Sequence, residues 1–202
     1  IGSRSLLTNS TGASNTAIGK DSLEANTTAS NNTAVGFQSM KLNTTGTRNT
    51  AFGSLSLDSN TTASDNTSIG YAALATNTTG TQNVAVGAFA LDANTTAGNL
   101  TAVGYNALSA NTTGTENTGL GRQALLNNLT GGFNVAVGVN ALYQNTTADN
   151  NTAVGTSALG ANTTGTQNVA VGSGALDANT TAIRNNAFGN SALGSNTTGQ
   201  YN

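Results

Sequence analysis

The stretch NTAVGTSALGANTTGTQ, residues 151–167, is one copy of a seventeen-residue unit that recurs along the whole chain. We number its positions from 1 at Asn151 to 17 at Gln167, so residues seventeen apart share a repeat position. An unbroken short period is typical of a solenoid in which each unit forms one coil and stacks on the next. The sequence therefore predicts twelve stacked coils. Each coil has a glycine at position 5: Gly2, Gly19, Gly36, Gly53, Gly70, Gly87, Gly104, Gly121, Gly138, Gly155, Gly172 and Gly189.

The residue types within the unit favour strands over helices. Glycine and Asn-Thr-Thr recur too often for a helix to propagate, and β-branched residues gather before position 5. We expect one strand at residues 151–154, ended by Gly155, a second strand near 158–159 and a return corner at 162–165. The predicted fold class is all-β, a parallel β-solenoid.

The placement of charge predicts which positions face inward, because a charged side chain is rarely buried without a partner. Acidic and basic residues occur only at positions 6, 7, 10, 16 and 17. We therefore expect positions 1 to 5, 8, 9 and 11 to 15 to form the inner set. Two large apolar groups per coil, at positions 4 and 9, make a thin core. Association of several chains would bury more apolar surface, so we expect an oligomer.

Asparagine occupies position 12 in every unit, and two interpretations are open. In stacked parallel coils, identical amides hydrogen-bond to those above and below and form a ladder. Each of these asparagines is also followed two residues later by threonine, which matches the acceptor pattern for glycosylation. The candidate ladder or glycosylation residues are Asn26, Asn43, Asn60, Asn77, Asn94, Asn111, Asn145, Asn162, Asn179 and Asn196.

Position 6 carries Phe37, Tyr71, Tyr105 and Val139 on alternate coils, about 9.6 Å apart along one face if coils stack at the usual strand spacing. We call these four residues the aromatic stripe. Aromatic side chains supply a large contact area at low entropic cost, so the stripe is a candidate contact surface for a partner or a sugar. It is equally compatible with a seam between neighbouring chains, or with single exposed aromatics that have no role.

Composition argues against several classes of function. Charged residues make up 7% of the chain against about 25% in an average domain, and the net charge is −2. Six scattered basic residues do not form a nucleic-acid surface. No apolar run approaches the roughly 20 residues that span a bilayer. Histidine and cysteine are absent and the eight acids occupy variable positions, so we expect no enzyme, with no catalytic, cofactor-binding or metal-binding residues.

The core of each unit, Ala-aliphatic-Gly-x-x-Ala or Ser, resembles the head-domain repeat of trimeric autotransporter adhesins, and similar repeats occur in bacterial and phage fibre proteins. The motif stands at Ala17-Ile18-Gly19 with Ser22 and at Ala153-Val154-Gly155 with Ala158, and it recurs along the whole chain. The resemblance implies a left-handed parallel β-roll in which three chains pack side by side. It also implies that their apolar ladders meet near a trimer axis.

The expected function is an extracellular or cell-surface fibre, structural or adhesive, that gives reach and a repetitive display surface. We expect residues 1–202 to form a single domain, a segment of a longer fibre, with copies of itself and a host or surface ligand as partners. One alternative is a self-polymerising, glycosylated filament subunit. A lesser alternative is an ice-binding solenoid, because Thr-Gly-Thr occurs at 45–47, 79–81, 113–115 and 164–166.

Overall fold

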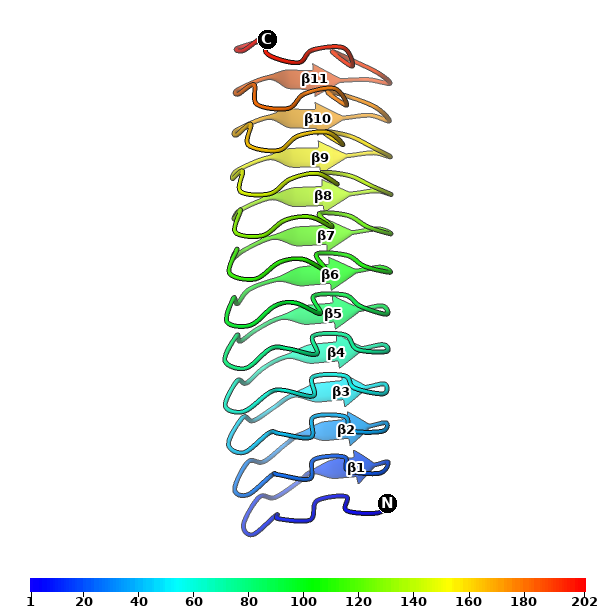
Figure 1. Ribbon diagram of the computed structural model, residues 1–202, viewed down its shortest axis with the longest axis vertical. Coiled ribbons are helices and arrows are strands. Elements are labelled where there is room, and N and C mark those ends of the chain that lie inside the picture. Colours follow the sequence, from blue (N-terminus) through cyan, green and yellow to red (C-terminus); the bar gives the residue numbers. More distant parts are fainter.

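The structure of residues 1–202, a computed structural model, consists of strands and turns and contains no helix. Figure 1 shows the strands one above another in a single column. They form one parallel sheet in chain order. The strands are β1 Thr16–Ile18, β2 Thr33–Val35, β3 Thr50–Phe52, β4 Thr67–Ile69, β5 Val84–Val86, β6 Thr101–Val103, β7 Thr118–Leu120, β8 Val135–Val137, β9 Thr152–Val154, β10 Val169–Val171 and β11 Asn186–Phe188.

Each strand pairs with the strand seventeen residues later, without a slip in register. Thr152 of β9 lies opposite Val169 of β10, and Val154 opposite Val171. Because the register is the repeat itself, every repeat position becomes a column of side chains along the axis. The predicted all-β parallel solenoid with seventeen-residue spacing is confirmed.

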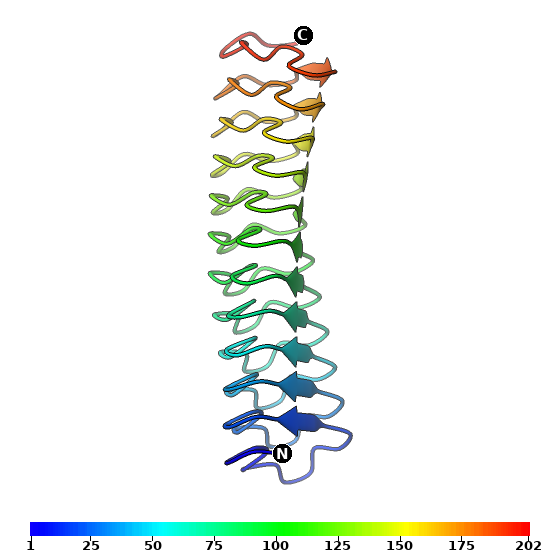
Figure 2. The same cartoon turned by 90° about the vertical axis from the view of Figure 1, so that its right-hand side faces the viewer.

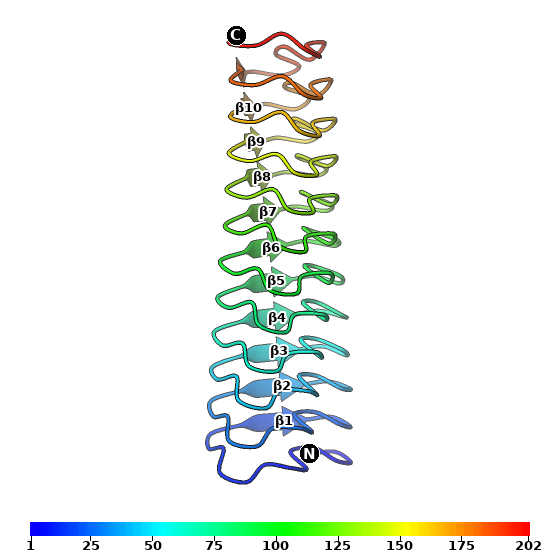
Figure 3. The ribbon, with the colours of Figure 1, turned by 60° about the vertical axis from the view of Figure 1, so that its left-hand side comes forward.

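Figures 2 and 3 show the strands along one side of the column and the turns along the other sides. The strand direction changes gradually from β1 to β11, so the column is twisted, as parallel strands are. No helix in the structure is long and apolar enough to cross a membrane.

The second strand predicted near 158–159 is wrong, because these residues lie in a run of turns. Ser157 and Leu159 have φ values of 55° and 52°, in the left-handed region, and this curls the backbone away from an extended path. The segment still stacks through its backbone. The Leu142 amide donates to the Ala158 carbonyl oxygen at 3.0 Å, and the Leu159 amide donates to that of Ala175 at 2.9 Å.

The interior is a narrow column of alanine and leucine. The position-9 side chains are fully buried in every coil except the two terminal ones, where Leu6 is half-buried and Leu193 is exposed. The predicted inner ladder is confirmed for the ten inner members: Leu23, Met40, Leu57, Leu74, Leu91, Leu108, Leu125, Leu142, Leu159 and Leu176. Alanines at positions 3 and 8 pack against them in one cluster of 28 buried residues. Small side chains at these positions let the two walls of each coil approach closely.

The predicted inward orientation of position 4 is wrong. Side chains alternate between the two faces of a strand, and in each strand position 3 faces inward while positions 2 and 4 face outward. Ala153 is fully buried, whereas Phe52 is 55% exposed and Phe188 is 70% exposed. The buried columns are positions 1, 3, 8, 9, 12 and 15, which is a smaller inner set than charge placement predicted.

Glycine at position 5 is required by a close approach between coils. Gly155 has a φ of 133°, and a Cβ built on it would lie 2.6 Å from the carbonyl carbon and oxygen of Gly172. No other residue combines this conformation with the absence of a side chain. The glycine column therefore ends each strand and permits the close approach of successive coils at this position.

Candidate functional site

One face of the sheet has no partner within the chain: the outer sheet face, which we define as the side chains at positions 2 and 4 of β1–β11. Position 2 carries threonine or valine except at Asn186, and neither position carries a charge. Position 4 is apolar in every strand: Ile18, Val35, Phe52, Ile69, Val86, Val103, Leu120, Val137, Val154, Val171 and Phe188. Each of these eleven residues is exposed or half-buried.

Such a face is unusual for a parallel sheet, because parallel sheets are normally covered on both sides. Eleven strands at the usual spacing give an apolar row about 48 Å long. Continuous exposed apolar patches of this extent mark interaction surfaces more often than scattered single residues do. The outer sheet face is therefore the candidate site for a large partner.

The position-12 asparagines form a buried ladder along the interior. The Asn43 Nδ2 donates to Asn26 Oδ1 at 3.0 Å and to the Gly46 carbonyl oxygen at 3.0 Å. The same pair of bonds recurs at Asn60 and along the column to Asn179, and Asn9 and Asn128 take part as well. Nine of the ten candidate residues, Asn26 to Asn179, are fully buried.

Asn196 differs from the rest of the column. It is half-buried, and its Nδ2 donates to the Gly199 carbonyl oxygen at 2.9 Å without a bond to the preceding asparagine. In the buried members both Nδ2 hydrogens are engaged, one by an amide and one by a carbonyl oxygen. A glycosyl group would have to replace one of these bonds and enter the core, so the buried members of the folded column offer no accessible acceptor nitrogen.

Position 1 carries a second amide column. Asn32 Oδ1 accepts from the Asn49 backbone amide at 2.9 Å, and the Asn49 Nδ2 donates to the Ala63 carbonyl oxygen at 2.8 Å. Leu100 donates its backbone amide to Asn83 Oδ1 at 3.0 Å but offers no side-chain oxygen to the next coil. The two columns tie each coil to its neighbour where the backbone does not form strands.

The predicted aromatic stripe is divided in the structure. Tyr71 and Tyr105 are each 50% exposed, and Phe89, at position 7 of the coil between them, contacts both rings edge to face. The ring centroids are 5.3 and 6.3 Å apart, with interplanar angles of 83°. Sequence reasoning missed Phe89, because it occupies a neighbouring column. These three residues interlock and support one another.

The other two members of the stripe stand apart from that cluster. Phe37 is 45% exposed and lies under the Lys20 ammonium, which is 5.9 Å from the ring centroid. Val139 is half-buried. Arg122 lies at position 6 between Tyr105 and Val139 and interrupts the apolar run.

Two carboxyl groups have shifted pKa values, for opposite reasons. Arg48 Nε donates to Asp65 Oδ1 at 2.6 Å and Nη2 donates to Oδ2 at 2.9 Å, and this pairing lowers the pKa of Asp65 and raises that of Arg48. Asp58 is partly buried, and desolvation raises its pKa while the charge of Lys41 acts in the opposite direction. Its Oδ1 is buried without a hydrogen-bond partner.

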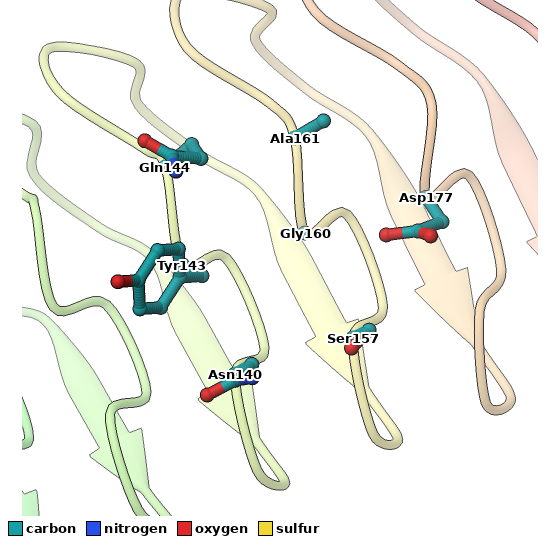
Figure 4. A pocket seen from close by; sticks show the side chains of 7 residues that line it. All are labelled: Asn140, Tyr143, Gln144, Ser157, Gly160, Ala161 and Asp177. Carbon is teal, nitrogen blue, oxygen red and sulfur yellow. The ribbon is translucent and has the colours of Figure 1, made fainter.

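The structure also has one hollow, of about 260 Å³, on the turn side of the stack. It lies over Gly160, the position-10 residue between Tyr143 and Asp177 in the same column. Sequence reasoning did not find it, because the only signal is a glycine where the neighbouring coils carry larger side chains. Figure 4 shows its lining residues: Asn140, Tyr143, Gln144, Ser157, Gly160, Ala161 and Asp177.

No protein-family model, curated protein or solved structure matches the chain. No group of three or more histidine, cysteine, aspartate or glutamate residues is placed to hold a metal ion.

Proposed function

We propose that the chain is a segment of an extracellular fibre, structural or adhesive, in which several copies pack side by side through their outer sheet faces. The observation that carries this proposal is the uncharged apolar row at position 4, which the single chain leaves facing water. Burying one large apolar side chain contributes roughly 1.5 to 3 kcal/mol, and each chain supplies eleven of them. Even partial burial of the row would then offset the entropic cost of association.

A bundle of parallel copies about a common axis suits this face. All copies share one rung spacing, so the position-4 columns of neighbouring chains stay in step along the whole length. Three copies place the three rows around one axis and cover each of them. The Ala-aliphatic-Gly motif, which resembles the heads of trimeric autotransporter adhesins, supports a trimer of left-handed β-rolls.

The internal bonding of the column supports a mechanical role. Each coil is held to the next by strand pairing, by backbone bonds in the turns and by two asparagine columns. Six lysine and arginine residues in 202 also leave few sites for trypsin-like proteases. A stiff, protease-resistant rod with identical rungs would provide reach and a repetitive surface outside the cell.

Light scattering of the native protein tests the proposal. One chain has a mass of 19.9 kDa, so a trimer would have a mass of three times 19.9, about 60 kDa. Val103→Asp places a charge in the middle of the outer sheet face and should shift the mass toward one chain, while Thr113→Asp, at exposed position 14, should leave it unchanged. A 20 kDa wild-type particle at tens of micromolar would refute side-by-side association, and a mass that grows with concentration would favour the filament alternative.

The ice-binding alternative has one fully regular threonine column in its favour and one irregular column against it. Position 14 is an exposed threonine in every unit, whereas the position-13 hydroxyls are mostly engaged, as where Thr44 Oγ1 donates to the Thr61 carbonyl oxygen at 3.0 Å. The parallel column at position 16 is irregular, with Gly98, Asp149 and Ile183 among its members. A flat ice-binding surface needs both columns, so we expect no thermal hysteresis; a measurable freezing-point gap would support this candidate instead.

A further inference from the structure

The hollow over Gly160 is built by a change of side-chain size within one column. Position 10 carries Tyr143, Gly160 and Asp177 on three successive coils, so a large ring and a carboxylate stand on either side of a residue without a side chain. In Figure 4 the Asp177 carboxylate leans back toward Gly160. A Cβ built on Gly160 would lie 2.6 Å from Asp177 Oδ1, which places that oxygen at the edge of the hollow.

The polar groups around the hollow have bonding capacity that the chain does not use. Asn140 Oδ1 is buried without a hydrogen-bond partner. Ser157 and Asp177 also line the hollow, and the Ser157 hydroxyl and the Asp177 carboxylate take no part in side-chain hydrogen bonds within the chain. The Tyr143 hydroxyl points away from Gly160, so Tyr143 offers the hollow its ring (Figure 4). Figure 4 shows the face of the Tyr143 ring open beside these groups. Free polar groups beside an exposed aromatic ring are a common composition of a ligand site.

We propose that this hollow binds the ring of a neutral sugar. A pyranose has one face of C–H groups, which packs on an aromatic ring, and a rim of hydroxyls, which donate to a carboxylate or amide oxygen and accept from a hydroxyl. A volume of about 260 Å³ lies just below the range of drug-sized pockets, which suits one ring and not a longer chain.

The charge of the site selects against other ligands. The carboxylate of Asp177 has no basic residue beside it in the hollow, so a phosphate or an acidic sugar meets repulsion. It is the only acid in the lining, and a divalent cation requires more oxygen ligands of that kind. None of the lining residues belongs to the outer sheet face, so packing of copies through that face leaves the hollow open. Repetition of a weak site on several copies would then raise the apparent affinity for a glycan surface.

Saturation-transfer NMR on the native protein tests the proposal, with methyl β-glucoside, methyl β-galactoside, N-acetylglucosamine and sialic acid as probes. We expect transfer to at least one neutral sugar, strongest at the protons of its C–H face, and none to sialic acid. Tyr143→Ala should weaken binding of that sugar about tenfold through loss of the stacking surface. Gly160→Ser should abolish binding by filling the hollow.

The serine variant has a precedent within the fold. Ser109 occupies the same repeat position, and its Oγ donates to Asp92 Oδ1 at 2.7 Å, so the coil accepts this side chain beside an aspartate. Gly194→Ser makes the same change at position 10 away from the hollow and should leave binding intact. Circular dichroism checks that all variants fold. Absence of transfer to every neutral sugar, transfer that survives Gly160→Ser, an unchanged affinity in Tyr143→Ala, or equal loss in Gly194→Ser would each overturn the proposal.

Discussion

The side-chain amide of Asn60 donates to Asn43 Oδ1 at 2.8 Å, across seventeen residues of sequence and one step of the stack. Both residues are fully buried, and Asn60 also donates to the Ala63 carbonyl oxygen at 3.1 Å. This relationship repeats along position 12, so each amide is donor to one neighbour and acceptor to the other. The interior of the solenoid is therefore held by directional bonds as well as by its leucine column.

Asn60→Ala should destabilise the fold much more than its size suggests. The substitution leaves the buried Asn43 Oδ1 without a donor. It also removes one of two donors to the Ala63 carbonyl oxygen and one of two acceptors of Asn77 Nδ2. A loss of about 3 kcal/mol in the free energy of unfolding is expected. Urea unfolding measures it, with Thr62→Ala, at exposed position 14, as the control that should change stability little. Equal effects of the two changes would contradict a structural role for the ladder.

Gly155→Ala should destabilise the fold, whereas Gly119→Ala should not. A methyl group on Gly155 meets the Gly172 carbonyl at 2.6 Å in a backbone conformation that alanine avoids, so a loss of about 3 kcal/mol or more is expected.

Gly119 provides the matched control for that change. It is the only glycine at position 3, and its added Cβ would lie 3.3 Å or more from its neighbours. Since the other strands carry alanine or serine there, Gly119→Ala should be neutral or stabilising by up to about 1 kcal/mol. Thermal unfolding compares the two variants, and similar losses in both would refute the assigned close approach at position 5.

Features that depend on residue type and spacing could be predicted from the sequence, whereas the orientation of side chains and the turn conformations could not. The period, the strand at Thr152–Val154 and the buried leucine column follow from residue types at fixed spacing. The orientation of position 4 did not follow. Positions 3 and 4 are both apolar, and a shift of one residue reverses the face of a strand. The left-handed conformation of Leu159 was not predictable either, because leucine has no preference for it and the stacking bonds impose it.

The candidate sites also differ in whether spacing alone reveals them. The asparagine column was identified by its spacing alone, whereas Phe89 and the Gly160 hollow depend on contacts between different columns. A glycine among larger residues of one column is visible in the sequence only once the columns are known.

Asp58→Asn should stabilise the protein at neutral pH. Burial raises the folded-state pKa of Asp58, so the ionised carboxylate opposes folding above that pKa and the protonated group does not. The variant should therefore be more stable than the wild type at pH 7. This difference in stability should disappear as the pH falls below the unfolded-state pKa of about 3.9. Melting temperatures of both proteins between pH 3 and 7 measure this difference. A variant that is less stable than the wild type at pH 7 would contradict the conclusion that the ionised Asp58 carboxylate opposes folding.

Asp65→Asn should show the opposite dependence. Arg48 lowers the folded-state pKa of Asp65, so the ionised carboxylate favours folding above the unfolded-state value and the contribution is lost as the pH falls through the folded-state value. The variant should melt slightly below the wild type at pH 7, and the two should converge in acid. The effect should also shrink in high salt because the pair is exposed. If the melting temperature of the variant lies equally far below that of the wild type at 1 M salt, the difference does not arise from the ion pair.

Cysteine cross-linking at the outer sheet face tests the central claim most directly, because the chain has no cysteine of its own. Val103→Cys places one thiol at position 4 of β6, where neighbouring copies should meet, and Thr113→Cys places one at exposed position 14. Under mild oxidation at micromolar concentration, we predict that the first variant forms a covalent dimer of twice 19.9, about 40 kDa, while the second stays at 20 kDa. No cross-link at position 103, or equal cross-linking at both positions, would contradict the packing of copies through the outer sheet face.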